Sequence, residues 1–234
     1  MPATLTTVYT VALKPLITVA VTSGLLVVLW IIGRITFTLQ FFSVSGSANL
    51  PTLRPGRFFF TSNLMKPNRF KLICYRVVTP DRGPAIRTHR LCGLPGDIVE
   101  IKAGVLYVNG KNEDQRLSLM HVYKIEQKDT FGIVYDRSQA YTIPPYADII
   151  YAPLEDKYVQ RSQLPCALYI LPPGMRDEVI FQLYKKNWNR DHFGPLRVPA
   201  GKFFVLADNR ENTEDSRYKG FIGQSTCEGT VLWK

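Results

Sequence analysis

Residues 44–53, with the sequence VSGSANLPTL, form the stretch on which the interpretation of the whole chain depends. They follow the one long apolar segment of the chain and precede a run of sequence typical of β-strands. The small residues and the pair Pro51-Thr52 favour a sharp turn that another chain can approach closely. Such turns are common, so this one alone does not indicate a function. Its interpretation depends on two later stretches, residues 89–97 (HRLCGLPGD) and 207–217 (ADNRENTEDSR).

Residues 16–33 (LITVAVTSGLLVVLWIIG) carry no charge, and their length is close to the ~20 apolar residues that cross a bilayer core. Trp30 and Arg34 at the end of this segment suit an anchor at the membrane interface. A cleaved signal peptide is the alternative, but its apolar run usually has about 7–15 residues and ends at an A-x-A-like site, which does not follow here. We therefore expect residues 1–34 to form a retained anchor and residues 35–234 a separate domain.

Composition limits the classes of function. At 234 residues with 46% hydrophobic content, the chain is long enough for one sizeable domain and an anchor. The net charge of +10 is scattered without a Lys/Arg-rich block, so we expect a membrane surface and no nucleic acid as partner. The four cysteines form no C-x-x-C pair and have no histidine at zinc spacing, so neither a metal nor a cofactor is expected. Cys74 and Cys92 fit buried strands. The sequence alone does not decide whether Cys166 and Cys227 form a disulfide.

The pattern beyond the anchor predicts an antiparallel β-fold. Short runs of alternating or β-branched and aromatic residues are separated by Gly, Asn and Pro turns. The predicted strands are residues 35–41, 58–61, 70–78, 98–101, 105–108 and 201–207. Between them, residues 112–196 are broken by the proline pairs at 144–145 and 172–173, and we expect a β-rich insertion there. Within it, residues 177–184 (DEVIFQLY) fit either a short helix or a strand.

The three motif stretches, in this order, resemble the three sequence boxes of the type I signal peptidase family. These are membrane-anchored serine peptidases that remove signal peptides. The family's first box reads roughly V-S-G-x-S-M-x-P-T-L and matches residues 44–53 without a gap. Its second box, K-R-x-x-G-L-P-G-D followed by G-x-x-x-x-N-G, matches residues 89–97 and 104–110. Its third box, G-D-N-R-x-x-S-x-D-S-R-x-x-G, matches residues 207–220.

The resemblance implies a mainly β fold. We expect a signal-peptidase-type antiparallel β domain, with residues 112–196 inserted, on one N-terminal transmembrane helix. The framework positions of the boxes match the family pattern: Pro51, Arg90, Gly93, Pro95, Gly96, Asp97, Asp208, Asn209, Arg210, Asp215, Ser216 and Arg217. Of these, Asp215 and Arg217 are expected to form a structural ion-pair cluster together with Arg90.

The catalytic positions depart from the family pattern. The family's nucleophilic serine falls on Ala48 and the next residue, a methionine, on Asn49. The lysine that acts as general base falls on His89, and Thr213 replaces the serine that helps to hold this lysine. Ala207 replaces the first glycine of the third box. Amide hydrolysis by this route needs a hydroxyl that attacks and a neutral base that takes its proton. The imidazole of His89 could be that base, as eukaryotic and archaeal signal peptidases have histidine there, but Ala48 has no hydroxyl.

Three interpretations follow. If the alignment shifts by one residue, Ser47 could act as nucleophile with His89, although such a slip turns a side chain on a strand to the opposite face. Ala48 could be an engineered serine-to-alanine change that traps substrate, but this does not account for the other changes, at Asn49, His89, Ala207 and Thr213. A naturally degenerate, non-catalytic homologue that still binds peptides or partners accounts for all the changes and is the interpretation we prefer.

Orientation in the membrane has two opposing indicators. Lys14 stands alone before the span, whereas Arg34, Arg54 and Arg57 follow it, and this count places the C-terminal part in the cytoplasm. The resemblance implies the opposite: a single-pass protein of the inner (cytoplasmic) membrane with its C-terminal domain on the periplasmic or extracytoplasmic side. We expect the second. The implied partners are the membrane and exported preproteins or signal peptides, or a secretion or processing complex.

Overall fold

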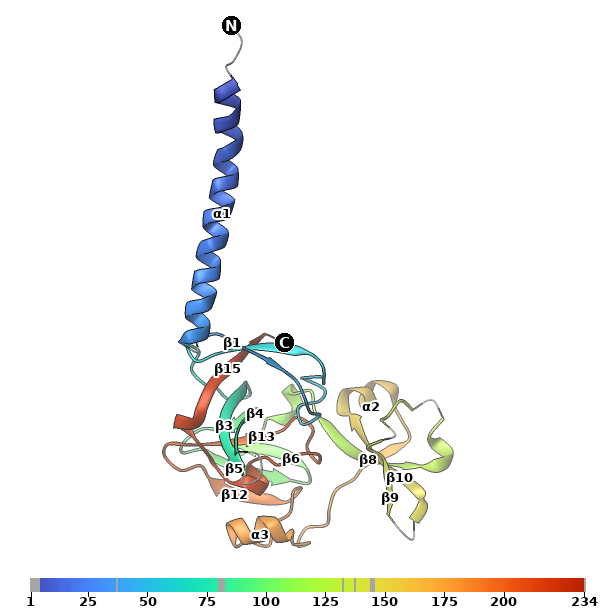
Figure 1. Ribbon diagram of the computed structural model, residues 1–234. Helices are drawn as coiled ribbons and strands as arrows, with labels where there is room; N and C mark the ends of the chain where they lie inside the picture. Colours follow the sequence, from blue (N-terminus) through green and yellow to red (C-terminus); the bar gives the residue numbers. More distant parts are fainter. Residues whose placement is uncertain are drawn as a thin grey trace.

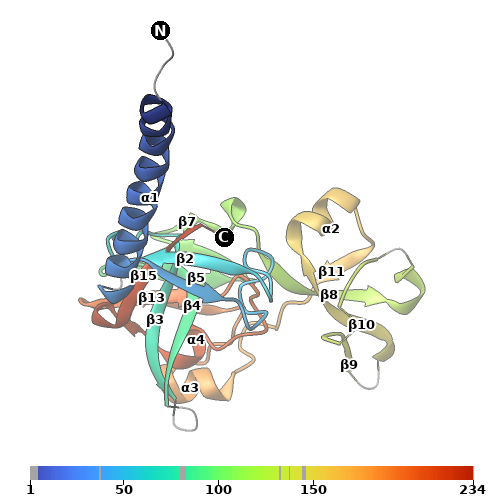
Figure 2. The same cartoon turned by 45° about the horizontal axis from the view of Figure 1, so that its top comes forward.

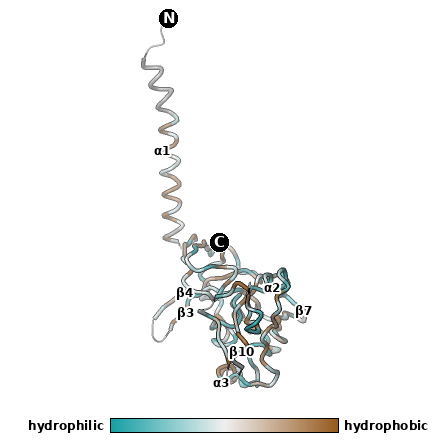
Figure 3. Tube along the Cα trace, turned by 90° about the vertical axis from the view of Figure 1, so that its right-hand side faces the viewer, coloured by the Kyte–Doolittle hydropathy of each residue, from teal (hydrophilic) through white to brown (hydrophobic). Residues whose placement is uncertain are grey.

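A long helix and a body of antiparallel sheets make up the protein (Figure 1). The computed structural model describes residues 5–36, 38–79, 83–131, 133–136, 138–143 and 146–233. The helix, α1 (Leu5–Ile35), stands away from the sheets, as Figure 3 also shows. Its segment Pro15–Gly33 has a mean hydropathy of 2.4 and no buried residue, so by length and composition it can cross a membrane.

The main sheet contains the motif-bearing strands. Its seven strands are all antiparallel and lie in the order β1-β2-β15-β3-β4-β13-β14. Their bounds are β1 Gln40–Ser43, β2 Phe58–Ser62, β3 Leu72–Thr79, β4 Gly83–Gly93, β13 Lys202–Leu206, β14 Ile222–Gly223 and β15 Cys227–Trp233. The long hairpin of β3 and β4 forms the centre of the sheet and carries His89 on its second strand.

A second sheet packs against the end of β4. It has the order β12-β5-β6-β7, with bounds β12 Phe193–Arg197, β5 Ile98–Lys102, β6 Val105–Val108 and β7 Lys111–Asn112. Their apolar side chains share one buried cluster with Cys92 of β4 and Phe204 of β13. The sheets approach so closely that a Cβ at Gly93 would lie 2.9 Å from side-chain atoms of Val99 and Val198.

A third sheet lies to one side of the other two and has its own core (Figure 2). Its order is β11-β8-β10-β9, with bounds β11 Cys166–Leu168, β8 Met120–Glu126, β10 Tyr146–Glu155 and β9 Tyr141–Ile143. A helix, α2 (Asp156–Ser162), follows β10 directly. All four strands fall inside residues 112–196, so this part of the chain is rich in β-structure, as the sequence predicts.

Short helices complete the fold. Residues 177–184 are resolved as a helix, α3 (Glu178–Tyr184), because Asp177 caps its first turn by accepting hydrogen bonds from the backbone of Val179 and Ile180. The others are α4 (Ser216–Lys219) and three single-turn helices, η1 Asp114–Arg116, η2 Gln127–Asp129 and η3 Gln224–Thr226.

Most predicted strands are confirmed, but the one expected at residues 35–41 is wrong in its first half. The helix α1 continues to Ile35, the backbone of Thr36 still donates to Ile32, and β1 begins only at Gln40. Phe37 lies outside the described residues, as do Pro144 and Pro145. The alternation of residues was too short to outweigh the helix that precedes it.

The cysteines are all free. Cys166 lies in β11 of the third sheet and Cys227 in β15 of the main sheet, so the disulfide left open by the sequence is not formed.

Candidate functional site

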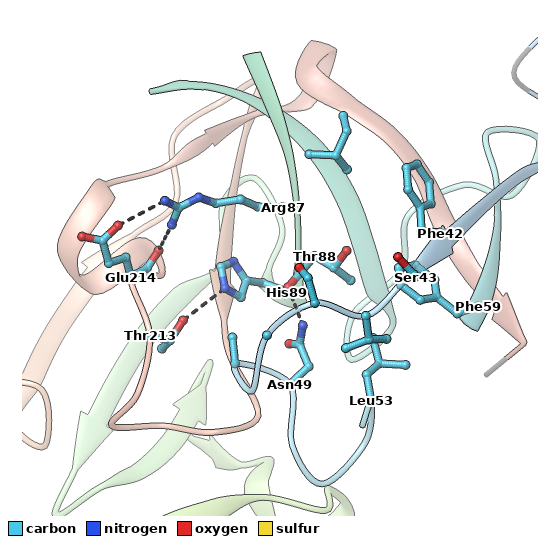
Figure 4. Close-up of a pocket in the computed structure, with 15 residues that line it drawn as sticks. Phe42, Ser43, Asn49, Leu53, Phe59, Arg87, Thr88, His89, Thr213 and Glu214 are labelled. Atoms are coloured by element: carbon cyan, nitrogen blue, oxygen red, sulfur yellow. Dashed lines mark hydrogen bonds and ion pairs between the residues drawn. The ribbon is translucent and has the colours of Figure 1, made fainter. Parts of the chain in front are cut away.

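The three motif stretches meet at one pocket of about 370 Å³ (Figure 4). Its walls come from the end of β1 and the loop after it, from residues 86–89 of β4, and from the segment 213–214 that follows β13. Ala48, His89 and Thr213 all line it. Sequence positions that are up to 165 residues apart therefore form a single site.

The loop 44–53 is fixed in place by hydrogen bonds. The backbone N–H of Asn209 donates to the Ala48 carbonyl over 2.9 Å, and the Asn209 side chain donates to the Ser47 carbonyl over 3.3 Å. Leu53, which is buried, donates its backbone N–H to the Asn49 carbonyl over 2.7 Å. Hydrogen bonds from the third motif thus fix the backbone of the first motif and set the position of Ala48 at the pocket.

His89 is only 3% exposed and both of its ring nitrogens are engaged. Nδ1 lies 2.7 Å from the hydroxyl of Tyr75, and Nε2 lies 3.2 Å from Oγ1 of Thr213. Burial lowers the pKa of His89 to about 4, although the nearby carboxylate of Asp215 acts in the opposite direction. Burial also raises the pKa of Tyr75, so the phenol keeps its proton. At neutral pH the ring is therefore an uncharged imidazole between two hydroxyls.

Ser47 and Ala48 differ in what they face. The Ser47 hydroxyl accepts a hydrogen bond from Nδ2 of Asn212 over 3.1 Å, and the same nitrogen lies 3.1 Å from Oε1 of Gln139. Ala48 lines the pocket with His89, whereas Ser47 is not among the residues of its wall. The structure brings Ala48, His89 and Thr213 together and directs the Ser47 side chain to another neighbour.

The model of the family described as "Signal peptidase, peptidase S26" matches residues 16–234. The chain belongs to the signal peptidase family. Among similar proteins, signal peptidase I of Aquifex aeolicus (strain VF5) is 24% identical over 215 residues, covering 88% of this chain and 79% of that protein. Signal peptidase I of Bacillus licheniformis is 26% identical over 196 residues, covering 83% and 75%.

A solved structure is also similar in sequence. It is a signal peptidase I from Enterococcus faecalis V583, 24% identical, with a TM-score of 0.35, and the match covers 72% of this chain and 98% of that one.

Two buried ion pairs brace the signal peptidase motifs. Arg90 binds Asp208 through Nε and Nη2 at 2.6 and 2.5 Å, and Arg217 binds Asp215 at 3.0 and 2.8 Å. Arg217 keeps the pKa of Asp215 below its usual value even though burial opposes the charge. The expectation that Arg90 joins the Asp215 pair is wrong, because Arg90 forms its ion pair with Asp208. Arg90 pairs with Leu206 in the β4–β13 ladder, and Asp208 follows two residues later.

The other framework residues also make structural contacts. Asp97 accepts hydrogen bonds from Arg69, from the backbone of Leu94 and from Asn109, which closes the turn that contains Pro95 and Gly96. Arg210 binds Asp114, Ser216 accepts from the backbone of Val205, and Pro51 lies at the turn of the loop beside Thr52, whose hydroxyl accepts from Arg90.

Sequence reasoning missed several residues of the site. Tyr75 could have been found from the hairpin register, since Ile73 pairs with His89 and Tyr75 is the next residue on the same face of β3. Ser43 and Ser45 also line the pocket; Ser43 lies outside the motif stretches, and Ser45 matches the first serine of the first box, which was not considered as a site residue. In the described part of the chain, no group of three His, Cys, Asp or Glu side chains is placed to hold a metal ion.

Proposed function

We propose that this protein is a non-catalytic member of the signal peptidase family that binds exported preproteins or their signal peptides at the membrane surface. The observation that carries the proposal is the position of Ala48. It lines the pocket together with His89 and carries only a methyl group at the position where the family has its serine hydroxyl. A neutral imidazole is available there, but a base without a nucleophile performs no attack on an amide.

A strand edge beside the pocket supports the binding of an extended peptide, although Asn49 Nδ2 already donates to the carbonyl of Thr88 on this edge over 2.6 Å. Among the described strands, β13 lies along β4 only at residues 90–93, so residues 83–89 have β3 on one side and no strand on the other. Backbone groups on such an edge can pair with an added strand, while pockets beside the edge select its side chains. The pocket beside this edge is the one that Ala48 and His89 line.

The apolar helix and the family support a position at the membrane. We infer a single-pass protein of the inner membrane with its C-terminal domain on the periplasmic or extracytoplasmic side. Large apolar side chains are exposed on the first two strands after the anchor, where Phe41 and Phe58 stack with their ring centroids 4.9 Å apart. Leu64 and Met65 are exposed just beyond β2. These side chains can enter the lipid surface next to α1.

An active peptidase is the second candidate function. The Ser47 hydroxyl is bound to Asn212, which argues against its attack on a substrate in the pocket. Ser45, however, is exposed and lines the pocket with His89. Its hydroxyl is therefore the better candidate nucleophile for an active peptidase. The sequence comparison considered only positions 47 and 48 for the nucleophile and left Ser45 out.

Cleavage and binding assays separate the two functions. The full chain in detergent is incubated with a purified preprotein, and products are identified by mass spectrometry. We expect intact preprotein. Cleavage that is lost in Ser45→Ala or in Ser47→Ala would overturn the non-catalytic proposal and identify the nucleophile.

Binding is measured with a fluorescent signal peptide and the same detergent-solubilised chain. Ala48→Phe fills the pocket and is expected to weaken binding at least about tenfold, since it removes the space for a side chain. The matched control is Ala167→Phe, at an exposed position of the third sheet, which should bind as the native chain does. Equal affinities of all three proteins would contradict peptide binding at this pocket.

A further inference from the structure

A second pocket, of about 360 Å³, lies between the loop 44–53 and the third sheet. Its volume is at the lower end of the range for ligand pockets, about 300–1,000 Å³. Its wall comes from Leu50 of the loop, Met120 of β8, residues 153–155 of β10, Tyr158 of α2 and residues 134–136. None of these residues lines the pocket of Ala48 and His89. We call the two sites the Tyr158 pocket and the His89 pocket.

The wall of the Tyr158 pocket is mainly apolar. Pro153 and Leu154 are buried, whereas Val134 is 78% exposed. The hydroxyl of Tyr158 accepts a hydrogen bond from the backbone N–H of Val134 over 3.2 Å, so this part of the wall is tied to α2. A large aliphatic or aromatic side chain suits such a pocket, because the burial of apolar surface favours binding.

Two carboxylates add a negative charge to this pocket. Asp136 and Glu155 both line it, and neither forms an ion pair with another described residue. Hydrogen bonds from Ser138 and Gln139 lower the pKa of Asp136, so this carboxylate is charged at neutral pH. Lys157, in the first turn of α2, donates to the hydroxyl of Ser118 over 2.8 Å instead. A cation that arrives beside the apolar side chain therefore meets complementary charge.

The two pockets share the loop 44–53. Ala48 lines the His89 pocket and Leu50 lines the Tyr158 pocket, and two residues span at most about 7 Å of chain. Asn212 also links the two sites, since its Nδ2 donates to the hydroxyl of Ser47 and lies 3.1 Å from Oε1 of Gln139, which lines the Tyr158 pocket. An extended peptide advances about 3.3 Å per residue, so a few residues lead from one pocket to the other.

We propose that the Tyr158 pocket is a second subsite for the preprotein that binds at the His89 pocket, and that it takes a large apolar side chain with a lysine or arginine next to it. The apolar side chain contacts the wall, and the cation lies at Asp136 and Glu155. The inference rests on the proposed function and gives the inserted region 112–196 a part in recognition. The shared loop favours one continuous peptide over a separate partner protein.

The first test varies the peptide. The probes are fluorescent peptides that contain a signal sequence and the first residues of the mature protein, with the pair Leu-Lys, Ser-Lys or Leu-Glu placed at successive positions. They are titrated against the full chain in detergent. At one position we expect Leu-Lys to bind at least about tenfold more tightly than Ser-Lys, which lacks the apolar side chain. At the same position it should bind at least about threefold more tightly than Leu-Glu, which brings a third negative charge.

The second test varies Glu155, whose side chain does not cap α2. In Glu155→Lys the ratio of Leu-Lys to Leu-Glu affinity should fall to about one, because one carboxylate and one ammonium group then remain at the pocket. Asp148→Lys is the matched control, since Asp148 is exposed on the same strand, β10, and lies outside the pocket wall. It should keep the native ratio. Melting temperatures are compared, and if Glu155→Lys does not fold, Glu155→Gln should still lower the ratio.

Several results would overturn the inference while peptide binding at the His89 pocket stands. The three probes could bind equally at every position and still be weakened by Ala48→Phe, or Glu155→Lys could weaken Leu-Lys and Leu-Glu by one factor. A short Leu-Lys peptide without a signal sequence could bind as tightly as the long probes, which would assign the pocket to a separate partner. If the native chain binds none of the probes, the proposed function itself fails.

Discussion

Nδ1 of His89 and the hydroxyl oxygen of Tyr75 lie 2.7 Å apart in a fully buried contact that joins β4 to β3. The histidine at the pocket is therefore also a member of the core of the main sheet. Both partners come from the same hairpin, and Tyr75 packs in the buried cluster with Ile73 and Leu91. Any change at His89 acts on stability as well as on the site.

Removing the Tyr75 hydroxyl should destabilise the protein. Tyr75→Phe leaves a buried ring nitrogen of His89 without its partner, and we expect the free energy of unfolding to fall by about 1–3 kcal/mol. The measurement is chemical denaturation followed by circular dichroism. The control is Tyr107→Phe, at a half-exposed ring that lies under Lys102. An equal loss in the two variants would show that the His89 contact contributes nothing.

Stability should fall in mild acid because of His89. Its folded-state pKa of about 4 lies below the ordinary value of 6.5, so between these two pH values the unfolded chain binds a proton that the folded chain does not. The free energy of unfolding then decreases as pH falls from 7 to 4, by at most about 1.4 kcal/mol per pH unit. Denaturation at pH 4.5, 5.5 and 7 should show a shallower dependence for His89→Gln than for the native chain. Parallel curves would contradict this.

A hydroxyl at position 48 should create cleavage. Ala48→Ser places an oxygen in the pocket that His89 lines, and we expect measurable processing of a preprotein by this variant alone. Because the base must be neutral, the rate should rise with pH through about 4 and then level off. The double variant Ala48→Ser/His89→Gln should be inactive. Cleavage that persists in the double variant would exclude His89 as the base.

Gly194 should tolerate no side chain. It has φ of +93°, and a Cβ there would lie 2.6 Å from the backbone oxygen of Val99 on the neighbouring strand. Gly201 has φ of +71° but no atom within 4 Å of such a Cβ. We expect Gly201→Ala to lose about 1 kcal/mol of stability through backbone strain alone, and Gly194→Ala to lose about 3 kcal/mol or more. Similar losses would mean that the close approach of β12 and β5 relaxes at little cost.

Orientation can be measured with an impermeant thiol reagent. Lys128 has a side chain that is 74% exposed, and Lys128→Cys in a Cys166→Ser/Cys227→Ser background offers one accessible thiol in the C-terminal domain. We expect labelling in intact cells. Thr6→Cys, at the other end of α1, should be labelled only after lysis. The reverse pattern would place the domain in the cytoplasm, as the count of flanking charges indicates.

Local patterns predicted the anchor, the antiparallel strands and the three motif stretches, because periodicity and turn residues act over a few neighbours. Partners that are distant in sequence were harder to predict. Arg90 and Asp208 are 118 residues apart, and nothing local tells which of the nearby carboxylates Arg90 takes. The direction of the Ser47 side chain was equally hard to predict, since it depends on Asn212, which is 165 residues away in the sequence. The helix that continues to Ile35 overrode a short alternating pattern.

The place of β15 in the main sheet has a consequence for biosynthesis. This strand follows the other described strands in sequence, yet it lies between β2 and β3 and pairs with both. While the ribosome is still making residues 227–231, β2 and β3 have no bridge between them. The anchor has by then left the ribosome. The main sheet therefore completes its folding as a chain tethered to the anchor, with the facing edges of β2 and β3 open until β15 pairs with both.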